Sequence, residues 1–213
     1  MDLYSYFRSS AAYRVRIALN LKGLDAKIVP IHLLRDGGQQ LLPSYRGLNP
    51  DGLVPVLVDE GEALHQSLAI IEYLEEIQPM PALLPTSPLD RAYVRGLALL
   101  IACDIHPLNN MRVLKYLKRI NVDDAARDEW YRHWIALGFQ ALEVRLARDP
   151  RTGDFAFGNS PTMADLCIVP QVFNAKRFSV DLTSFPVIQR ITENANRLQA
   201  FIDAAPAAQP DAE

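Results

Sequence analysis

Apolar and polar positions alternate with two different periods along the first 80 residues, which predicts strands and helices in turn. "DLYSYF" (residues 2–7) is rich in tyrosine and phenylalanine and predicts a strand. In residues 11–23 apolar side chains recur at helical spacing until a glycine ends the run. "AKIVPI" (residues 26–31) predicts a second strand. A helix that joins two strands is typical of a βαβ unit, in which the strands are parallel.

Three further elements complete this half of the chain. A loop with a short helix is expected in "DGGQQLLPSYRGLNP" (residues 36–50). "VPVLVDEGEALH" (residues 54–65) predicts a hairpin, with Asp-Glu-Gly at its turn. "QSLAIIEYLEEIQP" (residues 66–79) predicts a helix that a proline ends. The order βαβ-α-ββα therefore predicts a small α/β domain.

Only helical patterns follow the proline-rich stretch "PMPALLPTSP" (residues 79–88). One pattern runs without a break through residues 88–119, and a second surrounds the two tryptophans. The next helix begins at Thr162, a good N-cap, with Asp165 three residues later in the manner of a capping box. A last helix is expected in residues 185–202.

These patterns predict a fold of the class α/β plus all-α. We expect an α/β domain in residues 1–80, a linker in residues 81–87 and an all-helical domain in residues 88–213. The final "AAPAAQPDAE" (residues 204–213) has the composition of a disordered tail.

Charge and cysteine content exclude several classes of protein. The formal net charge is −3, whereas proteins that coat nucleic acid carry a strong basic excess. The two cysteines are far apart, and no Cys/His spacing typical of a metal site occurs, so we expect no metal. No signal peptide and no long apolar run is evident, which predicts a cytoplasmic protein that binds neither membrane nor nucleic acid.

Several motifs resemble the zeta class of the soluble glutathione transferases. "SSAAYRVRIAL" (residues 9–19) is similar to the class signature SSCxWRVRIAL, and "HQSLAIIEYLEE" (residues 65–76) resembles the segment that holds the γ-glutamyl end of glutathione. "GLVPVL", "TMADLCIVPQV" and "NAKRFSVDLT" extend the resemblance over nearly the whole chain. The resemblance implies a thioredoxin-like glutathione-binding domain, a helical second domain, glutathione as cofactor and a homodimer.

The resemblance also implies a thiolate at the start of the first helix. Ser9 is then the main hydroxyl donor to the glutathione sulfur, followed by Ser10 and the N–H of Ala11. Unpaired N–H groups at a helix start favour an anion, and a hydroxyl donor adds to this effect. On the residues alone, simple helix capping by Ser9 is the competing interpretation. Ala11 replaces the usual cysteine, so the nucleophilic sulfur belongs to the cofactor rather than to the protein.

The other implied glutathione contacts lie in three segments. Val54 and Pro55, joined by a cis peptide bond, bind the cysteinyl unit. Gln66 and Ser67 bind the γ-glutamyl carboxylate at a helix start, where an ordinary helix N-terminus is the alternative. Gln39 and Gln40 bind the glycyl end, or else they belong to an ordinary polar loop.

Three arginines suggest an acidic substrate. Arg8 directly precedes the serines, and Arg177 matches an arginine that lines the acidic-substrate pocket of the zeta class. Arg112 has no such match; a second carboxylate-binding role and a solvated surface position are both open. His106 and Asn110, four residues apart on the expected helix, are candidates for contact with glutathione or substrate.

We therefore expect a glutathione-dependent cis–trans isomerase of a maleyl dioxo-dicarboxylate. Arg112 and the missing cysteine favour the shorter substrate, maleylpyruvate, and maleylacetoacetate is the alternative. The rival classes are a general glutathione-conjugating transferase and a non-catalytic interaction module. The first predicts an apolar pocket, and the second predicts loss of the thiolate donor or of the Gln-Ser pair.

Overall fold

The computed structural model describes residues 1–213 and divides into two compact units. The first unit contains Met1–Leu83 together with Asn196–Glu213, and the second contains Leu84–Ala195. The chain changes from mixed to purely helical structure at this boundary, inside the stretch that we expected as a linker. None of the helices has both the length and the apolar composition that a membrane span requires.

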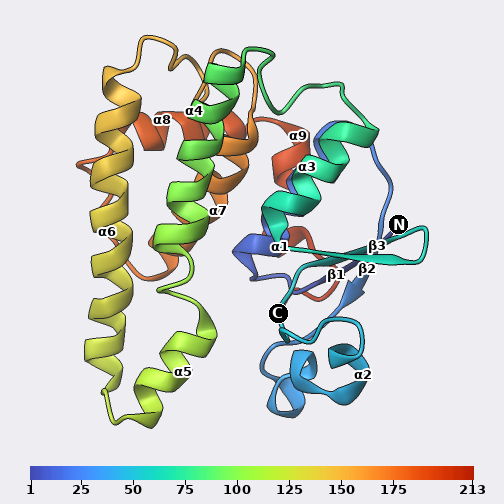
Figure 1. The fold of residues 1–213 in the computed structure, drawn as a ribbon. Helices are drawn as coiled ribbons and strands as arrows, with labels where there is room; N and C mark the ends of the chain where they lie inside the picture. Colours follow the sequence, from blue (N-terminus) through green and yellow to red (C-terminus); the bar gives the residue numbers. More distant parts are fainter. The chain divides into compact units, whose positions relative to one another are not determined.

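A four-stranded sheet forms the centre of the first unit (Figure 1). Its order is β2-β1-β3-β4, from the strands β1 (Asp2–Ser5), β2 (Lys27–Pro30), β3 (Val56–Asp59) and β4 (Glu62–His65). β1 and β2 are parallel and are joined by helix α1 (Ser10–Lys22), whereas β3 and β4 form an antiparallel hairpin. The βαβ and ββα patterns of the sequence are thereby confirmed.

Residues 1–83 of this unit contain three α-helices, α1, α2 and α3. α1 packs against α3 (Ser67–Ile77), and α2 (Pro43–Arg46) follows two short 3-10 turns in the predicted loop. α1 ends at Gly23, whose φ of 63° is a left-handed conformation that glycine adopts without strain. Lys22 in its last turn forms an ion pair of 2.6 Å with Glu75 of α3.

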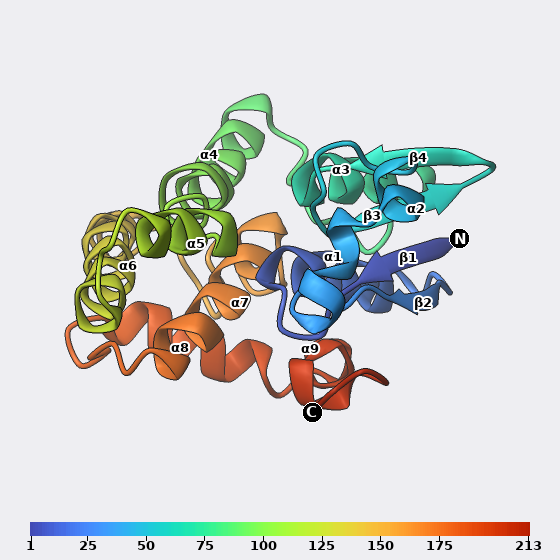
Figure 2. The ribbon, with the colours of Figure 1, turned by 90° about the horizontal axis from the view of Figure 1, so that it is seen from below.

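The C-terminal segment also packs on the first unit, which corrects two expectations. The pattern in residues 185–202 gives two helices, α8 (Pro186–Ala195) and α9 (Gln199–Ala204). α9 lies beside α1, and the segment beyond it is ordered rather than disordered (Figure 2). The physical reason is long-range pairing: Asp211, within the expected tail, accepts a hydrogen bond of 3.0 Å from the N–H of Phe7.

The second unit is a bundle of helices around α7 (Met163–Arg177). α4 (Pro88–Leu99) and α8 pack against α7, and the long α6 (Asp124–Arg148) packs against α8. The expected continuous helix over residues 88–119 is wrong. α4 continues as a π-helix, Leu100–Ile105, and the chain then turns before α5 (Met111–Arg119). Pro107 has no N–H to continue the helix, and Asn110 caps a new one.

Candidate active site

Ser9 is the N-cap of α1. Its φ and ψ of −70° and 114° are extended, and its side-chain oxygen accepts a hydrogen bond of 3.2 Å from the N–H of Ala12. The predicted cap is therefore present. A hydroxyl that accepts one N–H keeps its own proton for a second partner. The cap bond is thus compatible with donation to an anion at the same helix start.

The neighbours of Ser9 differ in exposure. Ser10 is buried, whereas Arg8 and Ala11 are half-buried. The guanidinium of Arg8 lies over the Phe7 ring, 4.8 Å from its centroid, and makes no ion pair within the chain. Ala11 lies in the first turn of α1, where backbone N–H groups have no intrahelical acceptor. This helix start therefore combines an available hydroxyl, first-turn N–H groups and a neighbouring cation.

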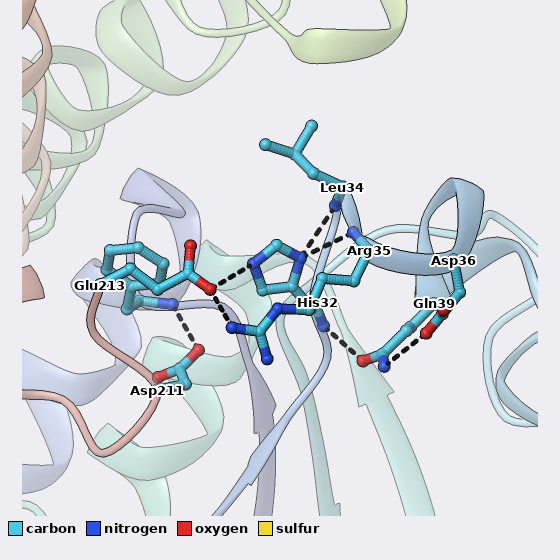
Figure 3. Close-up of polar contacts among 8 residues, drawn as sticks. His32, Leu34, Arg35, Asp36, Gln39, Asp211 and Glu213 are labelled. Atoms are coloured by element: carbon cyan, nitrogen blue, oxygen red, sulfur yellow. Dashed lines mark hydrogen bonds and ion pairs between the residues drawn. The ribbon is translucent and has the colours of Figure 1, made fainter.

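Gln39 and Gln40 lie in a loop that the C-terminal segment holds. Gln39 accepts a hydrogen bond of 2.8 Å from the N–H of His32, and its amide donates to Asp36. The ring of His32 accepts from the N–H groups of Leu34 and Arg35, and Glu213 pairs with Arg35 (Figure 3). Gln39 therefore has a structural role, which sequence reasoning did not anticipate.

Gln40 differs from Gln39, because it is 7% exposed and its Oε1 has no hydrogen-bond partner in the chain. A buried polar atom without a partner is costly, so this oxygen is well suited to accept from a donor of a ligand.

The Val54–Pro55 peptide bond, which the resemblance implied to be cis, is cis. Val54 is half-buried and Pro55 is buried at the entry to β3.

Gln66 and Ser67 form the start of α3. Gln66 has a φ of 68°, is exposed and gives no side-chain cap to the helix. Ser67 is 7% exposed, and its Oγ accepts a hydrogen bond of 3.3 Å from Nη1 of Arg14. This helix start contains no acidic side chain in its first turn. It therefore offers unpaired N–H groups and positive charge to an anion.

Sequence reasoning left the burial of Arg14 and Arg16 open. They are two residues apart on α1, a spacing at which two side chains do not share a helical face. Both are buried, at 2% and 3% exposure, since α1 is covered by α3 and also by α9. Burial lowers the pKa of Arg16 to about 10, although Tyr13 and Asp211 act in the opposite direction. The apolar residues on every side of these arginines in "AAYRVRIAL" were the available signal.

The second unit holds the remaining candidates. Arg112 and Arg177 are exposed and form no ion pair in the chain, and the guanidinium of Arg177 lies 5.7 Å from the centroid of the Phe178 ring. His106 follows the π-helix, and Asn110 caps α5 by accepting from the N–H of Arg112 at 3.0 Å. The expectation that His106 and Asn110 share one helical face is therefore wrong, because the chain turns between them. The side-chain oxygen of Asn110 already serves the helix.

Known proteins resemble this chain over its whole length. Residues 3–82 match the family "Glutathione S-transferase, N-terminal domain". A maleylacetoacetate isomerase of Pseudomonas aeruginosa is 50% identical over 99% of this chain and 98% of its own length. A solved holo structure of maleylpyruvate isomerase, described as a bacterial zeta-class glutathione S-transferase, has a TM-score of 0.97 with 48% identity and full coverage of both chains. The chain belongs to the zeta class of the glutathione S-transferases.

A second solved structure similar to this chain carries ligands. The maleylacetoacetate isomerase of Methylobacterium extorquens AM1, solved with bound malonate and GSH, is 40% identical with a TM-score of 0.96 over all of both chains. The first unit of this glutathione transferase fits such a tripeptide. Two of its buried side chains, Gln40 and Arg14, have polar atoms that no group of the chain satisfies. The helix starts at Ser9 and Ser67 add donors for anionic groups.

Proposed function

We propose that this zeta-class transferase is a glutathione-dependent cis–trans isomerase of a maleyl dioxo-dicarboxylate, converting maleylpyruvate to fumarylpyruvate. One observation carries the proposal: the chain shares 48% identity and a TM-score of 0.97 with a maleylpyruvate isomerase, with no part of either chain left uncovered. Both serines of the signature and the Gln-Ser pair are present. Their presence disfavours a non-catalytic module of the same fold.

Glutathione would be held by residues of the first unit. Ser9, Ser10 and the N–H of Ala11 would face its sulfur, and the Val54–Pro55 step its cysteinyl backbone. The γ-glutamyl carboxylate would bind at Gln66 and Ser67, and the glycyl end at Gln40 beside Gln39. When bound, glutathione supplies a thiol whose anion is the nucleophile of the isomerisation and is regenerated.

The chain's own contribution at the sulfur is electrostatic. A free thiol has a pKa of about 8.5, and hydrogen-bond donors at a helix N-terminus lower such values by favouring the charged form. Ser9 uses one lone pair for the cap of α1, which leaves its hydroxyl proton available for the sulfur. The site is therefore prepared to hold a thiolate before substrate binds, without reorganisation during the reaction.

Three arginines would bind the substrate's carboxylates: Arg8, Arg112 and Arg177. None of them is engaged in an ion pair within the chain, so each guanidinium is available to a ligand. Arginine matches carboxylates through paired donors, which suits a small dicarboxylate. The malonate in the Methylobacterium relative supports an acidic ligand in this class. Unpaired arginines also disfavour a conjugating transferase that acts on apolar electrophiles.

The test is the rate of isomerisation of maleylpyruvate with and without glutathione, followed spectroscopically. The expected result is strict dependence on catalytic amounts of glutathione, with no net consumption of the thiol. Glutathione-independent turnover, or stoichiometric formation of a glutathione conjugate, would contradict the proposal. The second candidate, maleylacetoacetate, is supported by the 50% identity to the Pseudomonas enzyme. It becomes the assigned substrate if its kcat/KM clearly exceeds that of maleylpyruvate.

The location and assembly of the protein complete the proposal. We propose a homodimer in the cytoplasm, as the class resemblance implies. Light scattering of the purified chain tests the assembly, and a monomer at micromolar concentration would contradict it.

A further inference from the structure

Arg14 is a buried cation without a counter-charge. Its side chain is 2% exposed, and its one hydrogen bond in the chain runs from Nη1 to Oγ of Ser67, at 3.3 Å. Nε and Nη2 are buried and have no partner, and no carboxylate lies within ion-pair distance. Burial of an unpaired charge is costly, so such a group is normally neutralised by a nearby anion. The chain itself supplies no such anion.

We propose that Arg14 is a positioning residue that acts through Ser67 to bind the α-carboxylate of the γ-glutamyl unit. This inference rests on the proposed use of glutathione. A guanidinium has five donors and no acceptor. When Ser67 accepts from Arg14, its hydroxyl proton cannot return to Arg14 and is directed to another acceptor. A ligand carboxylate is that acceptor, and it also supplies the missing negative charge.

The start of α3 supports an anion at this place independently. Ser67 is the first residue of an 11-residue helix, so its neighbourhood contains N–H groups without intrahelical acceptors. Gln66, the N-cap, accepts none of them through its side chain, and the first turn has no acidic residue. The helix dipole and the charge of Arg14 therefore act in the same direction, and both favour a bound anion.

Arg16, on the same helix, shows what a purely structural arginine looks like. It is 3% exposed, yet Nε donates to the carbonyl of Ala204 at 2.9 Å and Nη1 donates to Oγ of Ser5 at 3.0 Å. Its remaining contacts are to the carbonyls of Tyr6 and Phe7. All three of its nitrogen atoms are used within the chain, whereas two of those of Arg14 are not. The two arginines form a matched pair for a test.

The experiment compares two thiols on purified wild-type protein and on Arg14→Gln, Arg14→Lys and Arg16→Lys. One thiol is glutathione, and the other is γ-aminobutyryl-cysteinyl-glycine, which lacks only the α-carboxylate. Dissociation constants are measured by calorimetry, so that the result does not depend on turnover. Melting temperatures show how much of each effect is structural.

Wild type should bind glutathione about 10–100-fold more tightly than the analogue, because a charge-assisted contact is lost. In Arg14→Gln this preference should fall to about threefold or less, while affinity for the analogue changes by less than about twofold. Arg14→Lys should recover part of the preference, since an ammonium keeps the charge but not the fork geometry. Arg16→Lys should leave the preference at the wild-type value even if it melts earlier.

Several outcomes would overturn the inference. In the first, Arg14→Gln weakens the binding of both thiols by the same factor, which indicates a structural role only. In the second, it leaves the affinity for each thiol unchanged. If Arg14→Gln does not fold, Arg14→Lys is tested with and without Ser67→Ala. Additive effects of these two changes on the preference for glutathione are the third contradicting outcome. Wild-type protein that binds both thiols equally contradicts the inference alone, whereas protein that binds neither contradicts the proposed function as well.

Discussion

Two helices of this protein begin beside a buried ionisable side chain, but the chain satisfies the hydrogen bonds of only one of these side chains. α3 begins above Arg14, a cation with two unpartnered nitrogen atoms. α7 begins at Met163, and Asp165 lies in its first turn. The Asp165 carboxylate has no exposed surface and accepts from the N–H of Ala156 and from the N–H and hydroxyl of Thr162, at 2.8, 2.7 and 2.9 Å. The α7 start is satisfied by the chain and stabilises the fold. The α3 start lacks a partner and is suited to a ligand.

The difference shows that burial of a polar group does not by itself indicate its role. What separates the two places is the balance of donors and acceptors. At α7 one acceptor residue meets three donors of the chain. At α3 donors accumulate from Arg14, Ser67 and the helix backbone, and Oγ of Ser67 is the one acceptor that meets Arg14, leaving its Nε and Nη2 without a partner. An excess of unsatisfied hydrogen-bond donors, or of acceptors, is a stronger sign of a binding site than burial in the core.

The largest effect should come from Asp165→Ala, which breaks the satisfied helix start. Three buried donors would lose their acceptor, which costs about 3–5 kcal/mol of unfolding free energy. For a chain of this size the melting temperature should fall by roughly 10 °C. The affinity for glutathione of the protein that remains folded should not change. Asp181→Ala, which removes an exposed turn-forming carboxylate, is the control and should melt close to wild type. Equal losses in both variants would contradict the comparison.

The pH dependence of stability tests the same carboxylate without removing it. Burial raises the pKa of Asp165 to about 6, although hydrogen bonds from Ala156 and Thr162 work in the other direction. The folded protein then holds this proton more tightly than the unfolded chain. Its contribution to stability is complete below about pH 4 and is lost as the pH rises through about 6, amounting to about 3 kcal/mol at most.

Urea unfolding of wild type and Asp165→Asn between pH 4 and 7 measures this contribution. The amide stays neutral, so the wild-type advantage over Asp165→Asn should shrink with rising pH. An advantage that grows with pH would show that the three donors outweigh burial. The α7 start would then hold a stable anion, as α3 is proposed to hold one from a ligand.

Ser9→Ala sharpens the comparison, because α1 combines both kinds of helix start. The Ser9 oxygen caps the helix, and the Ser9 hydroxyl is proposed to donate a hydrogen bond to the glutathione sulfur. The variant should lose about 1 kcal/mol of stability through the cap and about 10–100-fold in kcat/KM through the sulfur contact. Steady-state kinetics over a pH series checks this, since the apparent thiol pKa should rise. A loss of stability alone would leave Ser9 as an ordinary cap.

Local features of the fold could be predicted from the sequence, and long-range ones could not. The cap at Ser9 and the pairing of Thr162 with Asp165 depend on residues three apart, and both were recognised. The break between α4 and α5 was missed, because Pro107 was not given weight against a continuous apolar period. The place of the C-terminal segment was missed as well, since it depends on contacts such as that between Asp211 and Phe7.

The candidate site shows the same limit. The resemblance to the zeta class implied the serines, the cis Val54–Pro55 step and the glutamines Gln39 and Gln40, because each belongs to a short motif. It did not indicate the state of Arg14, because local spacing cannot show that α3 and α9 cover α1. Which acceptors reach a buried guanidinium is decided by residues more than 50 positions away, as with Ser67.

The smallest effect concerns the backbone at Gln66, whose φ of 68° is disfavoured for any residue except glycine. Gln66→Gly should raise stability by up to about 1 kcal/mol, since the strain relieved exceeds the added freedom of the unfolded chain. The same change should weaken glutathione binding by loss of the side chain. Gln66→Ala, which loses the side chain but keeps the strain, is the control. Thr162→Gly at the start of α7, where φ is −121°, should only lower the stability of the protein. The start of α7 contributes to stability, whereas the start of α3 is proposed to bind a ligand.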